Sequence, residues 1–202
     1  MGKCYTVCSN SDIFMEEYVI LLGISGKRES GKSLLASYLE HYNGWTRFSL
    51  ADELKKQVMK DWSLLTSQLW GKEKESPTQY VRTNGAPLTG RDIMIREGVY
   101  RRSIDPLYYC KKFDERIGDK IVCDDIRFLN EIMFFKNNHG ARFVRLERSQ
   151  EAIGKAALDD LSETELDKYG MWDFKLEADL NKIPSDLQTF AKYLDERMQL
   201  AF

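Results

Sequence analysis

The chain has 202 residues, of which 43% are hydrophobic and 31% charged, with a formal net charge of −2. This length predicts one globular domain with a full core, or one domain with an inserted lid. The 30 basic and 32 acidic side chains create no bulk positive field, so nucleic acid is not an expected partner. Four cysteines without a signal peptide indicate a reducing compartment, so we expect a cytoplasmic protein. No apolar run approaches the ~20 residues of a membrane span.

The first 17 residues precede the first predicted strand and form a leader. Gly2 begins a short N-myristoylation pattern, with Cys4 placed where palmitate could be added. Because this short pattern is often met by chance, we expect no membrane attachment. Cys4 and Cys8 do not make a zinc site, since no second thiol pair or histidine pair stands nearby.

A glycine-rich loop follows the first predicted strand. Residues 19–22 form an apolar run as long as a buried strand, and residues 33–42 have the apolar spacing of a helix. Between them the sequence fits the phosphate-binding pattern G-x-x-x-x-G-K-[ST] at every fixed position. In such a loop the backbone N–H groups and the helix N-terminus face one anion. We therefore expect ATP here, with the lysine at its β- and γ-phosphates and the serine hydroxyl on Mg²⁺. The residues assigned to this nucleotide site are Gly26, Lys27, Arg28, Glu29, Ser30, Gly31, Lys32, Ser33 and Leu34.

Beyond the loop, strands and helices alternate along the chain. The other predicted strands are residues 45–50, 120–123, 142–146 and 172–176. One predicted helix begins at residue 51, and others cover residues 90–100, 105–117, 128–138, 148–168 and 184–200. The alternation predicts an α/β fold with a doubly wound, mostly parallel sheet. Such a sheet binds ligands beyond the carboxyl ends of its strands.

Two segments interrupt this regular pattern. Residues 63–90 are rich in Gly, Pro, Asn and Thr, and so long an irregular connection is usually functional or disordered. We interpret it as part of a substrate-binding insertion that spans about residues 51–105. Residues 148–168 are charged and helix-prone, and they begin with Arg148. They fit a lid that excludes water from a kinase site, or a simple surface helix.

Asp125 and Arg127 directly follow the predicted strand at residues 120–123. A carboxylate at that position can hold a Mg²⁺-bound water beside the phosphate loop, and the arginine can cover a transferring phosphoryl group. Alternatively, Asp125 caps the helix that begins near Phe128, and Arg127 is a surface charge. The spacing does not decide between these interpretations, nor between Asp124 and Asp125 as the metal ligand.

Basic side chains gather at three places that could hold a monophosphate dianion. They are Lys55-Lys56, Arg91 with Arg96, and Arg101-Arg102. A run of charges on a helix is more often a solvated face, and that interpretation comes first for Lys56 and Arg96.

These segments together resemble the phage-type deoxynucleoside monophosphate kinases, which are P-loop kinases. The resemblance covers roughly residues 19–181. It is carried by the loop S-G-K-R-E-S-G-K, the segment F-S-L-A-D-E-L-K, Lys74-Glu75, the block G-R-D-I-M, and D-I-R-F-L-N-E joined to S-E-T-E-L-D. The last pair is the most telling combination, because the loop alone is common to many nucleotide-binding proteins.

The resemblance implies a three-layer P-loop NTPase fold, with helices on both faces of the sheet and helical substrate-binding and lid insertions in a single domain of residues 1–202. By position, Lys32, Asp125 and Arg127 are the expected catalytic residues, and Ser33 and Asp125 the metal ligands, with Arg148 on the ATP side. The expected acceptor-binding residues are Asp52, Lys55, Glu75, Arg91 and Arg102. A homodimer is also what the resemblance suggests.

The implied function is transfer of the ATP γ-phosphate to a deoxynucleoside or nucleoside 5′-monophosphate, with ATP and Mg²⁺ as cofactors and small nucleotides as partners. Animal phosphomevalonate kinases share a related set of motifs, so phosphomevalonate or dephospho-coenzyme A is an alternative acceptor. A second class is a P-loop ATPase switch that transfers no phosphate to a small molecule. The small size of the chain and the insertion on the acceptor side favour a kinase.

Overall fold

A five-stranded parallel sheet forms the centre of the molecule. The computed structural model describes residues 19–115, 118–148, 164–178 and 183–200. The sheet has the order β2-β5-β1-β6-β7, and every neighbouring pair of strands is parallel. Its strands are β1 (Ile20–Gly26), β2 (Thr46–Phe48), β5 (Lys120–Cys123), β6 (Arg142–Arg148) and β7 (Phe174–Ala178). The central strand β1 therefore delivers the glycine-rich loop to the middle of the carboxyl edge.

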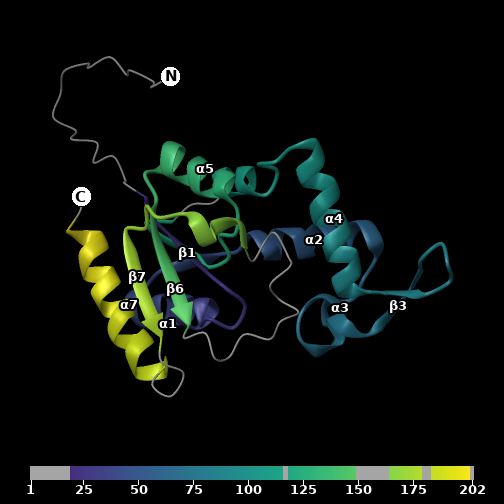
Figure 1. Cartoon of the computed structure of the whole chain (residues 1–202), viewed down its shortest axis with the longest axis horizontal. Coiled ribbons are helices and arrows are strands. Elements are labelled where there is room, and N and C mark those ends of the chain that lie inside the picture. Colours follow the sequence, from purple (N-terminus) through teal and green to yellow (C-terminus); the bar gives the residue numbers. More distant parts are fainter. Residues whose placement is uncertain (1–18, 116–117, 149–163, 179–182, 201–202) are drawn as a thin grey trace, which may run out of the picture.

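Helices cover both faces of this sheet (Figure 1). Because successive side chains of a strand point to opposite faces, Leu21 and Leu22 enter different hydrophobic clusters. Leu22 packs on the face that holds α1 (Lys32–Asn43) and α7 (Ile183–Gln199). Leu21 packs on the face that holds α5 (Leu129–His139). The predicted three-layer P-loop NTPase fold is thus confirmed.

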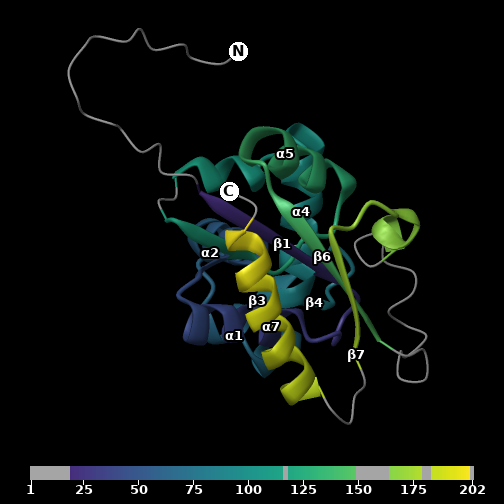
Figure 2. The ribbon, with the colours of Figure 1, turned by 90° about the vertical axis from the view of Figure 1, so that its left-hand side faces the viewer.

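The connection between β2 and β5 forms an insertion with its own small core. It contains α2 (Leu50–Trp62), α3 (Thr66–Leu69), the 3₁₀ helix η1 (Lys72–Glu75), a hairpin of β3 (Pro77–Val81) and β4 (Pro87–Thr89), and α4 (Gly90–Ile104). Its core residues are Val58, Leu64, Leu69, Leu88 and Ile93. The hairpin and α7 lie at opposite ends of the molecule (Figures 1 and 2).

Two predicted elements differ from the structure. The segment 63–90, expected to be irregular, contains the hairpin, whose turn lies around Asn84 and Gly85. The helix predicted over residues 105–117 is instead a turn followed by the 3₁₀ helix η2 (Cys110–Glu115). Asp105 ends α4 in an extended conformation, as a residue before proline prefers, but the sequence alone did not show that a turn and not an α-helix follows it.

The structure describes the end of the predicted lid segment but not the leader. The leader, with Gly2 and Cys4, and residues 149–163 of the predicted lid lie outside the described residues. The end of the lid segment forms a 3₁₀ helix, η5 (Glu165–Lys168), fixed by the buried Leu166. Within the described part of the chain, we find no helix with the length and apolar character needed to cross a bilayer.

Candidate active site

The glycine-rich loop curls around the ammonium group of Lys32. Gly31 has φ +94° at the start of α1, a left-handed conformation that suits glycine. Lys32 Nζ donates hydrogen bonds to the carbonyl oxygens of Gly26 and Lys27, both at 2.6 Å. The lysine side chain is buried, so its charge is held inside the loop rather than in solvent. An anion bound by the loop would therefore meet this ammonium group.

The loop also carries local strain and, within the described part of the chain, a hydroxyl without a hydrogen-bond partner. Glu29 has φ 63°, a conformation that residues with side chains rarely adopt and that concentrates at ligand sites. Among the described residues, the buried Ser30 Oγ has no hydrogen-bond partner. A buried hydroxyl of this kind fits a phosphate oxygen, which accepts hydrogen bonds readily.

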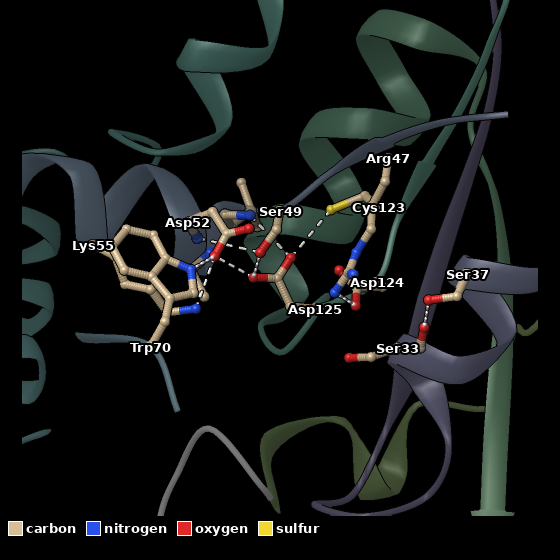
Figure 3. Close-up of polar contacts among 12 residues, drawn as sticks. Ser33, Ser37, Arg47, Ser49, Asp52, Lys55, Trp70, Cys123, Asp124 and Asp125 are labelled. Atoms are coloured by element: carbon tan, nitrogen blue, oxygen red, sulfur yellow. Dashed lines mark hydrogen bonds and ion pairs between the residues drawn. The ribbon is translucent and has the colours of Figure 1, made fainter. Parts of the chain in front are cut away.

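Asp124 and Asp125 lie beside the strand that leads into the loop. Cys123, at the end of β5, pairs in register with Gly23, and the Ile126 N–H donates to Ile24 O at 3.2 Å. The two carboxylates therefore leave β5 next to the carboxyl end of β1. Figure 3 shows the Ser33 hydroxyl pointing toward their side of the site.

Among the described residues, one carboxylate oxygen of Asp124 has no hydrogen-bond partner. Its Oδ2 forms an ion pair with Nη2 of Arg47 from β2, and its Oδ1 is buried with no hydrogen-bond partner in the described chain. The Asp124 side chain is only 3% exposed, and a buried unpaired carboxylate oxygen is costly unless a cation or donor satisfies it. This orphaned oxygen, with the Ser33 hydroxyl on the same side, fits the hard oxygen donors that Mg²⁺ requires.

Asp125 instead holds the first turn of α2. Its carboxylate accepts hydrogen bonds from the backbone N–H groups of Leu50 (3.0 Å) and Ala51, from Ser49 Oγ (3.1 Å) and from Cys123 Sγ (3.4 Å) (Figure 3). Burial, with a contribution from the Asp124 charge, raises the pKa of Asp125 despite these donors. The sequence-based alternative of a helix cap has the right chemistry but the wrong helix, because Asp125 caps α2 and not α5. As a metal ligand, Asp125 stays a prediction, and its accepted bonds make Asp124 the better candidate.

Glu131 caps the helix that follows Arg127. Glu131 Oε2 accepts hydrogen bonds from the backbone N–H groups of Arg127 (2.8 Å) and Phe128 (3.1 Å) at the start of α5. Burial raises the pKa of Glu131 to about 7. Arg102 Nη2 lies 4.0 Å from Glu131 Oε1. The guanidinium carbon of Arg102 lies 4.9 Å from the centre of the Phe128 ring and 5.3 Å from the centre of the Tyr109 ring. Arg102, an expected acceptor-binding residue, thus lies on the Arg127 side of the site.

A second polar group lies on the insertion, at the start of α2. Asp52 Oδ1 accepts hydrogen bonds from Lys55 Nζ (2.8 Å) and Trp70 Nε1 (3.0 Å), and the Lys55 ammonium lies 5.1 Å from the Trp70 ring centre (Figure 3). Burial acts to raise the pKa of Asp52, but hydrogen bonds and charge from Lys55 and Trp70 outweigh it, so the net pKa is lowered. We call Asp52, Lys55 and Trp70 the insertion cluster.

The other expected residues fall into separate positions. Arg91 and Glu75 form an exposed ion pair at 3.0 Å within the insertion. Arg28 and Leu34 are exposed at the loop. The structure describes the backbone of Arg148 at the end of β6 but not its side chain.

Several polar residues of the site were not identified from the sequence. Arg47 and Trp70 belong to no short motif, so no spacing signal could have found them. Arg145 stands in the segment 145–148, which is part of the family resemblance, but the resemblance gave it no role. Asp167 is part of the S-E-T-E-L-D segment, but the motif alone indicated no contact. Arg145 is buried in β6, contacts Ser25 Oγ at 3.2 Å and pairs with Asp167 at 2.7 Å.

The parallel sheet, the curled loop and the carboxylates beside it define a P-loop NTPase-fold protein. A protein of Acanthamoeba polyphaga mimivirus that carries the provisional name deoxynucleotide monophosphate kinase is 27% identical over 145 residues, covering 64% of this chain and 75% of the relative. The resemblance that the motifs predicted is therefore confirmed.

Among solved structures, TT1252 from Thermus thermophilus shares the fold with a TM-score of 0.52 and 14% identity, over 89% of this chain and 98% of that one. A gluconokinase from Sinorhizobium meliloti 1021 has a lower TM-score of 0.44 and 15% identity, over 91% of this chain and 98% of that one. No protein-family model matches the chain.

Proposed function

We propose that this chain is a nucleotide kinase that transfers the γ-phosphate of ATP to a deoxynucleoside or nucleoside 5′-monophosphate, giving ADP and the diphosphate. The observation that carries the proposal is the presence of two polar sites of different character. One is the phosphate loop with the orphaned oxygen of Asp124, and the other is the insertion cluster. A simple ATPase needs only the first.

The donor half rests on the loop. Lys32 Nζ hydrogen-bonds to the loop carbonyls, so its charge would face the β- and γ-phosphates of a bound triphosphate. Mg²⁺, when bound between Ser33 and Asp124, would neutralise negative charge on those phosphates. Arg47, paired with Asp124, adds fixed positive charge next to the same carboxylate.

The acceptor half rests on the insertion. Lys55 offers a cation that suits a phosphate, and the neighbouring Trp70 ring offers an aromatic surface that suits a base. Both lie near the start of α2. The mimivirus relative, whose provisional name specifies a deoxynucleotide monophosphate, supports this acceptor class.

The chemistry asks for positioning more than for a general base. In-line transfer forms a bond from an acceptor phosphate oxygen to the γ-phosphorus as the bond to ADP breaks. Arg127 follows the aspartate pair and would place its positive charge near the transferring group. Holding two anionic substrates in line by such fixed charges supplies most of the rate enhancement.

A coupled ADP-release assay tests the proposal. ATP is combined in turn with each deoxynucleoside and nucleoside monophosphate, phosphomevalonate and dephospho-coenzyme A. We expect ADP release that depends on a monophosphate nucleotide, lowered about 10²-fold in Lys32→Ala but unchanged in Lys136→Ala, which removes an exposed lysine from α5. ADP release that depends on phosphomevalonate or dephospho-coenzyme A would identify that compound as the acceptor in place of a nucleotide. ADP release without any acceptor dependence would rule out a kinase.

A further inference from the structure

One carboxylate links the phosphate loop to a segment far away in the sequence. In η5, Asp167 Oδ2 lies 2.9 Å from Nζ of Lys27, the second residue of the loop. Asp167 Oδ1 lies 2.7 Å from Nη2 of Arg145, on the strand next to β1. Each oxygen of the carboxylate thus binds a different cation, and both cations adjoin the loop.

The position of Asp167 is fixed by its surroundings. The preceding residue, Leu166, is 3% exposed in the core beneath α5. Arg145 is itself confined, because it donates to Ser25 Oγ at 3.2 Å and its guanidinium group lies 5.6 Å from the Trp172 ring centre. An arginine whose side chain is only 8% exposed needs a paired acid, and Asp167 provides it.

Lys27 is consequently held at two points. Its carbonyl oxygen accepts a hydrogen bond from Lys32 Nζ inside the loop, and its side chain is held outside the loop by Asp167. The loop is strained at Glu29, two residues further on, so it gains from contacts that maintain its curled shape. We propose that Asp167 is a positioning residue that keeps the phosphate loop in its triphosphate-binding shape through Lys27.

A positioning role and a purely electrostatic role of Asp167 predict opposite changes in triphosphate binding when its charge is removed. If Asp167 acted only as a negative charge near the bound phosphates, its neutralisation would tighten triphosphate binding. If it positions the loop, the same change weakens binding, because Lys27 loses its anchor. The direction of the effect therefore separates the two roles.

The test measures binding of ATP and of inorganic tripolyphosphate by isothermal titration calorimetry. Asp167→Asn and Lys27→Met should each raise the Kd of both ligands about tenfold, with the double variant no weaker than either single one. In steady-state assays the KM for ATP should rise by the same factor while kcat stays within about threefold.

Glu165→Gln is the matched control. Glu165 lies in the same 3₁₀ helix, and its Oε1 accepts a hydrogen bond from the Leu129 N–H at 2.8 Å, away from the loop. This variant removes the same charge and should leave the Kd within about twofold. If Asp167→Asn does not fold by circular dichroism, Asp167→Glu gives the test, because it keeps the charge and displaces the carboxylate from Lys27. A positioning role then raises the Kd, whereas a purely electrostatic role leaves it unchanged.

Unchanged or tighter triphosphate binding in folded Asp167→Asn, or effects that add in the double variant, would overturn the inference. The inference rests on the proposed function only for the identity of the ligand. Failure of the wild-type chain to bind ATP would contradict both the positioning role of Asp167 and the proposed kinase activity. ATP binding without acceptor-dependent phosphate transfer would contradict only the kinase activity.

Discussion

Exchanging Asp124 and Asp125 for asparagine, one at a time, should separate metal binding from helix capping. Asp125→Asn keeps the size of the side chain but replaces one acceptor oxygen by an N–H₂ group that faces donors of α2. One buried backbone N–H is then left without a partner, which costs about 1–3 kcal/mol, and a charge-assisted bond is lost as well. Burial disfavours the negative charge of Asp125, as the raised pKa of its carboxyl shows. The substitution removes that charge, and this offsets part of the cost.

We therefore expect Asp125→Asn to lower the free energy of unfolding by about 2–3 kcal/mol. For a chain of this size that corresponds to a fall in Tm of roughly 4–12 °C. Asp124→Asn should cost about 1 kcal/mol, because the amide oxygen can still accept a hydrogen bond from the partly exposed Arg47, and Oδ1 has no partner to lose in the described chain. Its effect should instead appear in the Mg²⁺ concentration needed for half-maximal activity, raised at least tenfold, with kcat lowered about 10²-fold.

Thermal unfolding followed by circular dichroism, together with a Mg²⁺ titration of ADP release at fixed ATP, measures both effects. The reverse pattern would refute these roles. In that case Asp125→Asn would keep the wild-type Tm but need more Mg²⁺ for half-maximal activity, while Asp124→Asn would behave like the wild type.

Three further predictions concern the other charged groups of the site. Lys32→Ala and Arg127→Ala should each lower kcat about 10²-fold with the fold intact by circular dichroism, and near-normal turnover in either would remove that residue from the mechanism. Trp70→Phe loses the hydrogen bond to Asp52 and should raise the KM for the acceptor about fivefold but not that for ATP; equal changes in both KM values would argue against an acceptor-side role. Burial raises the pKa of Glu131 from 4.5 to about 7, so the folded state is favoured while this carboxyl is protonated, and stability is lost as the pH rises from about 4.5 to about 7. That loss corresponds to about 3 kcal/mol and should vanish in Glu131→Gln when urea unfolding is compared at pH 4.5 and pH 8; an equal loss in the variant would contradict it.

The parts of the fold that depend on local pattern could be predicted from the sequence. Apolar runs such as residues 120–123 indicate the parallel sheet, and the glycine-rich loop indicates the position of the nucleotide site. The hairpin of the insertion was missed because β3 and β4 are short and each begins with a proline, which argues against a strand in a sequence pattern.

The site shows a similar division. Motif positions such as Lys32 were predictable, since the chemistry of phosphate binding fixes their spacing. Contacts between distant segments were not, because Asp167 is 140 residues from Lys27 and Arg47 is 77 residues from Asp124. Nor did the spacing of Asp124 and Asp125 show which of them turns toward α2, a choice made by the tertiary packing of the insertion.

The separate core of the insertion has a consequence for how the molecule opens. Its residues, such as Val58 and Ile93, form a cluster distinct from the two clusters on the faces of the sheet. Amide hydrogens of α3 and the hairpin should then exchange with solvent through a local opening that leaves β1 and β5 protected. We expect Asp125 to mark the boundary of that opening, because it binds the first N–H groups of α2 to the end of β5. The insertion would thus open locally as one unit while the strands of the sheet stay protected from exchange.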